Sequence, residues 1–337
     1  MARQQVSDLR SRWEGDTIGG DSQYMYLVVV PVAPSLCSVQ HGRSLAKVRC
    51  VVRVVSLGSG SDGNAILVQN DTTAVLVDDG FGLRELKSRL NQAHVKPEDI
   101  SAILITHEHS DHAGGARTFA RHFGIPLIAD PRTLNALFAT PERGMPGAPP
   151  PERVEMPVGH TLPWGRLEIA SFPVSHDAVA PCGYVLSSAA WRVFVATDTG
   201  TVTDAMLEAM RLAHLIIVEA NHDHERLLNG PYPWYLKQRI LGPRGHLSND
   251  QTKLALEKAL DDGPRWLWLA HLSRTNNTPD IARACIREHL RQFGLRHIQP
   301  QPLPHAFGPM WDSAALWATP PKSAPGETPA SPTVVNG

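Results

Sequence analysis

Ile100-Ser-Ala-Ile-Leu-Ile-Thr106 is followed directly by His107-Glu-His-Ser-Asp-His112, which places three imidazoles within six residues of a strand end. An apolar run of this length that stops at polar residues predicts a buried strand with a loop after it. Histidines at i and i+2 can converge where a strand gives way to a loop, while Asp111 and His112 begin the next turn and can face a second ion. The spacing therefore predicts two metal ions.

The small residues Ala113-Gly-Gly115 complete this motif. A histidine-rich surface loop is the alternative in a chain with 16 histidines, but it does not account for a strand, H-x-H-x-D-H and small residues in succession. The motif resembles that of the metallo-β-lactamase superfamily, whose members use a binuclear centre to hydrolyse lactams, thioesters, lactones and phosphodiesters. The resemblance implies a four-layer αβ/βα sandwich with both metals at one edge of the facing sheets.

Later segments match the remaining motifs of that superfamily in the expected order. Ala74-Val-Leu-Val-Asp78 resembles the early strand whose closing aspartate orients the histidine loop without binding metal. Three further strand-like runs end at His176, Asp198 and His271. Each of these residues alone is a weak signal, because a polar residue often ends an apolar strand for structural reasons. Their order and context make them strong together.

The resemblance also implies a ligand set. It assigns the first metal to His107, His109 and His176, the second to Asp111, His112 and His271, and the position between the two to Asp198. Nitrogen and oxygen ligands without a thiolate suit zinc or manganese. Two such cations lower the pKa of a shared water, so the expected nucleophile is a metal-bridging hydroxide. Asp111, which would help to hold the second cation, is also predicted to be a catalytic residue.

A second informative region extends from Glu219-Ala-Asn-His-Asp223 to Arg244-Gly-His-Leu-Ser-Asn249. Together with the preceding motifs it resembles the YycJ-type (WalJ-type) branch, over about residues 52–280, and characterised members of that branch are implicated as DNA exonucleases. The branch is also similar to ribonuclease Z, which has a proton-shuttling Glu and His pair. The resemblance implies that His246 is a general acid and that Glu219 orients it. The alternative is that His246 only helps to start the next helix.

That helix start can be read locally. Ser248 with Gln251 three residues later is the pattern of a capping box and predicts a helix over 249–260. His246 would then lie just outside a helix N-terminus, where free N–H groups favour an anion and lower the pKa of an imidazole. Further helices are expected at 83–92, 115–123, 132–139, 203–213 and 279–293, and early strands at 51–57 and 65–69.

Five residues are predicted to contact substrate: Asn64, Asn221, His222, Lys237 and Arg239. The two cations, with Arg244, are interleaved with three aromatic residues, Tyr232, Trp234 and Tyr235. Rings of this kind stack on unpaired bases while cations meet phosphates. The alternative is an amphipathic helix with solvated charges and packed rings.

Composition limits the function without choosing it. The chain has 337 residues, 42% of them hydrophobic, which is enough for one large domain. We expect an N-terminal extension over 1–51, the catalytic domain over 52–312 and a Pro-rich disordered tail over 313–337. The net charge is −1, from 32 basic and 33 acidic residues, so DNA binding has to use a local patch. The oligomeric state stays open.

The cysteines and the apolar runs indicate the compartment. Cys37, Cys50, Cys182 and Cys285 are widely spaced, which argues against a disulfide framework and favours a reducing cytoplasm. The longest apolar candidate, Tyr24 to Ala33, is interrupted by Pro31 and falls short of the ~18–20 residues of a membrane span. The expected localisation is therefore cytoplasmic, with no membrane partner.

One residue departs from the family pattern. Asp79 follows Asp78 at a position where a small residue is common, and it either adds charge near the metals or faces solvent. The sequence as a whole predicts a binuclear metal-dependent phosphodiesterase, most specifically a 5′ to 3′ DNA exonuclease. Hydrolysis of a small phosphodiester, lactone or thioester is the alternative. A non-enzymatic binding module is a third reading, against which the complete ligand set counts.

Overall fold

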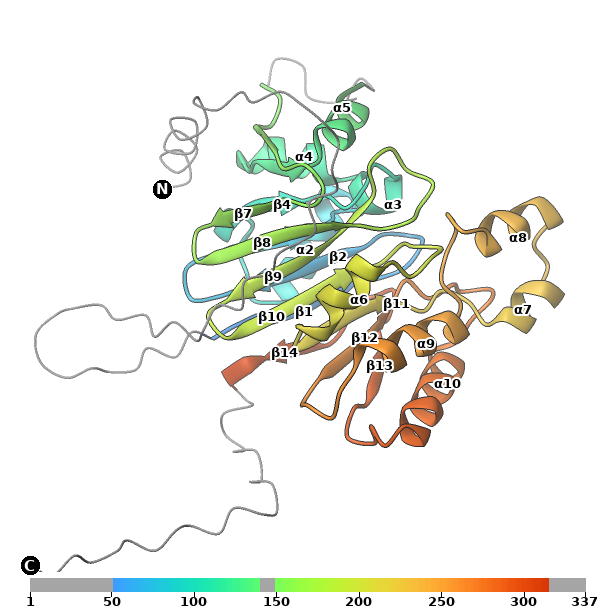
Figure 1. The fold of residues 1–337 in the computed structure, drawn as a ribbon. Helices are drawn as coiled ribbons and strands as arrows, with labels where there is room; N and C mark the ends of the chain where they lie inside the picture. The colour runs from blue at the N-terminus through green and yellow to red at the C-terminus, as the bar shows by residue number, and fades with distance from the viewer. Residues whose placement is uncertain (1–50, 140–148, 315–337) are drawn as a thin grey trace, which may run out of the picture.

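Two mixed β-sheets pack face to face, with helices on both outer faces (Figure 1). This computed structural model describes residues 51–139 and 149–314. The expected four-layer αβ/βα sandwich is confirmed. Nearly all of the predicted extension and tail, and most of the Pro/Gly-rich loop at 141–151, lie outside the described residues.

The first sheet has the strand order β14-β1-β2-β3-β4-β5-β6. Its strands are β1 (Arg53–Gly58), β2 (Ala65–Gln69), β3 (Ala74–Val77), β4 (Ile100–Leu104), β5 (Leu127–Ala129), β6 (Arg153–Glu155) and β14 (Met310–Asp312). The outer layer beside it contains α2 (Leu83–Gln92), α4 (Ala116–Phe123) and α5 (Pro131–Ala139) (Figure 1). A 3-10 turn, Pro97–Asp99, precedes β4, and the short α3 (Ser110–Ala113) follows it.

The second sheet has the order β13-β12-β11-β10-β9-β8-β7. Its strands are β7 (Thr161–Trp164), β8 (Leu167–Pro173), β9 (Cys182–Ser188), β10 (Trp191–Ala196), β11 (Leu215–Glu219), β12 (Trp266–Ala270) and β13 (Pro300–Pro302). The helices on its outer face are α6 (Asp204–Arg211), α9 (Asn249–Ala259) and α10 (Pro279–Gln292). Two more helices, α7 (His224–Asn229) and α8 (Trp234–Leu241), project from one side of the sandwich (Figure 1).

Strand β4 shows why apolar runs are nearly continuous in this fold. Ala102 and Leu104 face the apolar layer between the sheets, whereas Ile103 and Ile105 face the layer under the helices. Successive side chains of a strand point to opposite faces, and both faces are covered here. Polar residues are therefore excluded until the chain leaves the sandwich. It leaves at Thr106 and His107.

Local signals placed most elements correctly. The helices predicted from the sequence match α2, α4, α5, α6, α9 and α10 to within two residues at each end. Ser248 caps α9 in a complete capping box with Gln251, and Thr278 caps α10 with proline at the first helical position. Ser313, which the sequence assigned to the tail, is buried and bonded to Val52.

No helix within 51–139 or 149–314 combines the length and the apolar character that crossing a bilayer would require.

Candidate metal centre

The predicted ligands meet at the ends of several strands. His107 comes shortly after β4, Asp198 after β10 and His271 directly after β12, and parallel pairing of β10, β11 and β12 brings the ends of these strands to one edge. His176 follows β8 at the same edge. Active sites of open α/β sheets form at carboxyl ends of strands, because loops there are free to vary. The fold thus gathers residues that lie far apart in the sequence.

Asp78 acts as a buried support for the histidine loop. Its carboxylate accepts hydrogen bonds from the Thr106 backbone N–H at 2.8 Å and from the Thr106 hydroxyl, and it lies 2.8 Å from Nδ1 of His112. The bond to Nδ1 fixes the ring and leaves Nε2 for the centre. Asp78 has φ of 64°, an uncommon value that the surrounding bonds hold in place.

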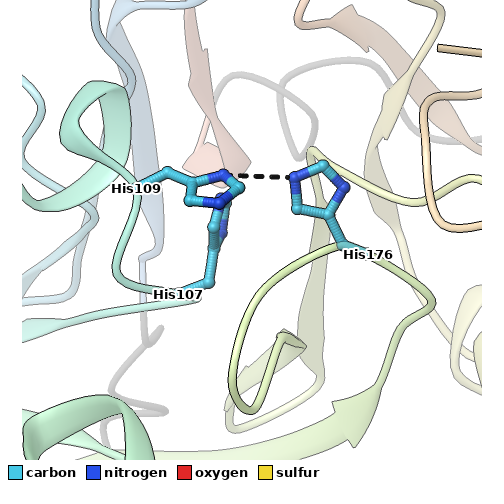
Figure 2. A group of neighbouring side chains, drawn as sticks. All are labelled: His107, His109 and His176. Atoms are coloured by element: carbon cyan, nitrogen blue, oxygen red, sulfur yellow. Dashed lines mark hydrogen bonds between the residues drawn. The ribbon is translucent and has the colours of Figure 1, made fainter. Parts of the chain in front are cut away.

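Three imidazoles form the first group. His107, His109 and His176 turn toward one another (Figure 2), with one ring nitrogen from each within 4.8 Å of the others. Nδ1 of His176 donates to the Gly245 carbonyl at 3.1 Å, which leaves its Nε2 3.3 Å from Nδ1 of His109. Neighbouring imidazoles at such distances suit a shared cation better than mutual hydrogen bonds.

Asp198 lies at the middle of the remaining ligands. Its Oδ2 is 2.5 Å from Nε2 of His112 and 3.5 Å from Nε2 of His107, and its Oδ1 is 2.8 Å from Nδ1 of His271. Nε2 of His271 is in turn 3.4 Å from the Asp111 carboxylate. Asp198 therefore lies within reach of imidazoles from both predicted ligand groups.

The donor set fits a divalent cation. Nε2 of His107 is a buried atom without a hydrogen-bond partner, although buried polar atoms are nearly always satisfied. Burial and the neighbouring His112 hold the pKa of His107 well below its usual value, so its ring is neutral with a lone pair to give. The pKa of Asp198 is also held well below its usual range: burial opposes this, but the surrounding imidazoles, with His271 and His112 foremost, outweigh it.

A second buried carboxylate adjoins this group. Glu219 is fully buried at the end of β11, and its Oε2 accepts from the backbone N–H groups of Thr199 and Leu247. Its Oε1 accepts from Nδ1 of His246 at 2.7 Å, and that nitrogen is also 3.3 Å from Oδ1 of Asp198. The His246 side chain retains 18% exposure. The pair therefore reaches from a fixed buried anchor to the open side of the centre.

The charge on His246 differs from the sequence expectation. A helix N-terminus was expected to lower the pKa of this imidazole, and that prediction was wrong. Burial does lower the pKa, but Glu219 and Asp198 beside the ring outweigh burial and raise it to about 9. Two carboxylates within hydrogen-bond range act more strongly than the partial charge of a helix end.

Residues 73–272 match the family model described as beta-lactamase superfamily domain. The chain belongs to the metallo-β-lactamase superfamily. It is 37% identical over 239 residues to the exodeoxyribonuclease YycJ of Bacillus anthracis, a match that covers 71% of this chain and 89% of the relative. It is 39% identical over 239 residues to the exodeoxyribonuclease WalJ of Streptococcus pneumoniae, with 71% and 88% covered.

Solved structures agree on the fold. The metallo-β-lactamase fold protein YhfI of Bacillus subtilis superposes with a TM-score of 0.59 at 17% identity, over 78% of this chain and all of that one. Such a likeness shows a shared architecture and no more. The superfamily fold thus accounts for the sandwich and for the edge at which the ligands meet.

A cavity of about 170 Å³ opens beside this superfamily centre. His246 lines it from the metal side, Arg239 and Tyr232 line it from the α8 side, and Asn221 and Ser61 complete the wall. The Arg239 Nε donates to Asp177 at 2.6 Å, and Asp177 follows the predicted ligand His176. Arg239, a predicted substrate residue, therefore lines the same cavity as His246. Glu219 and His246 are called the acid pair below.

Two predicted substrate residues also contact predicted ligands. Asn221 donates through Nδ2 to the backbone carbonyl of His271 at 2.9 Å, where the chain has a positive φ of 53°. Nδ2 of Asn64 lies 3.1 Å from Nε2 of His112. His222 is buried, both of its ring nitrogens lack a partner, and burial lowers its pKa to about 4.

Lys237 has a role that the sequence did not predict. It is 9% exposed, and its ammonium donates to the backbone carbonyls of Leu228 at 2.7 Å and Gly230 at 2.8 Å. Those carbonyls lie at the end of α7, where helical acceptors lack intrahelical partners. Lys237 therefore ties α8 to the end of α7.

We expect Lys237→Met to lower the free energy of unfolding by about 2 kcal/mol, because two backbone carbonyls lose a charged donor. Urea unfolding measures this, with the exposed Lys258→Met as a control that should change stability by less than about 0.5 kcal/mol. A Lys237→Met protein with wild-type stability and a weaker, less salt-dependent affinity for DNA would restore the phosphate-contact assignment.

Asp79 neither faces solvent nor adds charge to the centre. It is fully buried, its Oδ1 accepts from the Phe81 N–H, and its Oδ2 has no partner. Burial raises its pKa to about 8, so the carboxyl is mostly neutral at pH 7. The alternative of a solvent-facing side chain is wrong, because the Asp79 backbone is hydrogen-bonded to His112 and Gly115 and the residue is buried between them.

Two contributors were missed in the sequence. The Thr106 hydroxyl lies between Asp78 and Nδ1 of His107, at 2.9 Å and 3.0 Å respectively. Asp177 contacts the predicted ligand His176 and accepts a hydrogen bond from Arg239. In both cases the available signal was a polar residue directly adjacent to a ligand histidine, which is where groups that orient ligands are found.

Proposed function

We propose that the protein is a metal-dependent exodeoxyribonuclease, which hydrolyses the phosphodiester bonds of DNA from the 5′ end. The observation that carries the proposal is the buried Glu219 bonded to His246, directly beside the shared ligand Asp198. The match to the relatives named as exodeoxyribonucleases covers most of each relative's length, and it supports DNA as the substrate.

Two divalent ions, zinc or manganese, are proposed for the centre. One would be held by His107, His109 and His176 and the other by Asp111, His112 and His271, with Asp198 between them. When bound, such ions activate water for attack and offset the charge that develops on the phosphate.

The protein groups supply the proton and the orientation. Nδ1 of His246 is engaged by Glu219, so the other ring nitrogen is available to donate a proton to the departing oxygen at the cavity. Glu219 cannot turn, because two backbone N–H groups hold its second oxygen. Arg239 meets the phosphate at the cavity mouth. Each group therefore has one task in a single hydrolysis.

The test is cleavage of duplex DNA labelled at either the 5′ or the 3′ end by metal-reconstituted protein. We expect mononucleotide release from the 5′ end that depends on added metal. Release from the 3′ end would correct the polarity alone. A fully metallated protein that cleaves neither substrate would refute the proposal and leave a small phosphodiester, lactone or thioester as the substrate.

A further inference from the structure

The cavity beside the metal centre has two chemically different sides. Its apolar side contains Tyr232, Leu236 and Ile240. Leu236 and Ile240 are four residues apart on α8 and are therefore neighbours on one helix face, and Tyr232 comes two residues before the helix begins. An aromatic ring and two aliphatic side chains thus line the same cavity as His246.

Hydrogen bonds fix this apolar side relative to the acid pair. The His246 backbone N–H donates to the Ile240 carbonyl at 3.0 Å. The residue before Ile240 is Arg239, whose Nε donates to Asp177 as described above. The C-terminal part of α8 is therefore tied both to His246 and to the loop that carries His176. The apolar side chains have a defined position beside the ring that we propose donates the proton.

Hydroxyl and amide groups form the polar side of the cavity. It contains Ser61, Asn221 and Ser273, which come from three separate segments of the chain. The Ser273 backbone N–H donates to the Asn221 carbonyl at 2.8 Å, which holds two of these segments together. The Ser273 Oγ accepts from the Asn276 backbone N–H at 3.1 Å, so its own proton can be donated to a ligand. Nδ2 of Asn221 is used by the His271 carbonyl, which leaves the amide oxygen as an acceptor.

We propose that this cavity binds the sugar and base of the nucleotide whose 3′ oxygen departs. This inference rests on the proposed function and names the part of the DNA that the cavity recognises. His246 lines the cavity and is the proposed proton donor, so the departing oxygen lies there together with its sugar. The bond between that oxygen and phosphorus breaks, water supplies the new oxygen on phosphorus, and the departing oxygen takes the proton of His246. The phosphate stays on the other fragment.

The two sides of the cavity match the chemistry of a nucleoside. A base has an apolar face and polar edges, so its face can pack on the Tyr232 ring while its edge bonds to Ser273 and Asn221. Packing of a base on an aromatic ring is tolerant of sequence, as an exonuclease requires. A small phosphodiester or a lactone without a base would leave Tyr232 and Leu236 uncovered, which disfavours it as the occupant.

The experiment compares DNA with and without a base at this position. The metal-reconstituted full chain digests two duplexes that differ only at the nucleotide on the 5′ side of the scissile bond, which is the terminal nucleotide in digestion from the 5′ end. One duplex carries thymidine there and the other a tetrahydrofuran abasic residue, each opposite thymine so that neither is paired. We expect kcat/KM to be about tenfold higher for the duplex that carries the base.

Tyr232→Ala is expected to remove this preference. Its kcat/KM should fall about tenfold on the duplex with the base but stay close to the wild-type value on the abasic duplex, which has no base to pack. Tyr232→Phe should keep the preference, because the ring is retained. The matched control is Phe293→Ala, which removes an exposed ring at the end of α10, outside the cavity lining, and should leave both values unchanged.

The outcomes separate this inference from the proposed function. A wild type that cleaves both duplexes equally well refutes the nucleoside pocket and leaves the nuclease standing, and this comparison needs no variant. A preference for the base that survives Tyr232→Ala also refutes the pocket. Equal losses of Tyr232→Ala on both duplexes would give the ring a structural role and overturn the inference. A fully metallated wild type that cleaves neither duplex refutes the proposed function itself.

Discussion

Asp198→Asn is expected to reduce the bound divalent metal and to slow DNA cleavage by on the order of a thousandfold or more. Asp198 is the residue shared by the two ligand groups, and its oxygens lie within 2.5 to 3.5 Å of three ligand imidazoles. An amide replaces one anionic oxygen with an N–H group, which cannot bind a cation. Metal content by elemental analysis and cleavage of end-labelled DNA measure the two effects.

Asp130→Asn is the matched control for this variant. Asp130 is also buried, at 3% exposure, but its carboxylate accepts from Arg132 and from the Val158 backbone N–H. It should retain metal and cleavage even if its stability falls. An Asp198→Asn protein with the wild-type metal content and rate would overturn the assignment of the whole centre.

His246→Ala is expected to slow DNA cleavage by about 10²- to 10⁴-fold while the metal content stays unchanged. The reason is that an alkoxide leaving group needs a proton and His246 is held by Glu219 to donate it. p-Nitrophenolate leaves readily without a proton, so the hydrolysis of a p-nitrophenyl phosphodiester should slow much less. Comparing the two substrates isolates proton donation from a general structural effect.

Glu219→Gln extends the same test to the positioning residue. It should give the same contrast between substrates as His246→Ala but a smaller loss, because the amide still fills the space and can bond to the imidazole. A cation could also be held by another set of side chains whose ligand atoms lie close together, Asp198, Glu219, His246 and His271. Loss of metal from His246→Ala, with equal losses on both substrates, would identify His246 as a ligand and end its role as an acid.

Part of the predicted metal site could be read from local signals in the sequence. A buried strand covered on both faces has no room for polar groups until it ends, so a histidine or aspartate immediately after it lies at the sheet edge. The capping box of α9 and the proline at the first position of α10 were such local signals. The fold and the full set of seven ligands, in contrast, were predicted by the resemblance to the superfamily, because His176, Asp198 and His271 are weak signals on their own.

Other features depended on tertiary contacts that a sequence pattern does not encode. Lys237 is of a residue type that often binds phosphate, yet its ammonium donates to a backbone carbonyl at the end of α7. Asp79 was ambiguous because nothing in the sequence showed that its backbone bonds to His112 and Gly115. The pKa of His246 depends on carboxylates that arrive from two strands far away in the chain. In each case a partner remote in sequence decided the outcome.

The α7–α8 segment leaves the sandwich after Glu219 and returns at His246, and these two residues are hydrogen-bonded to each other. Asn221 bonds to Leu247 and His222 pairs with Ser248, so the segment is a loop closed firmly at its base. The entropy of closing a loop rises only slowly with its length. Residues can therefore be added or lost at the tip of this loop during evolution while Glu219 and His246 stay hydrogen-bonded to each other. The range of substrates can then evolve separately from the chemistry.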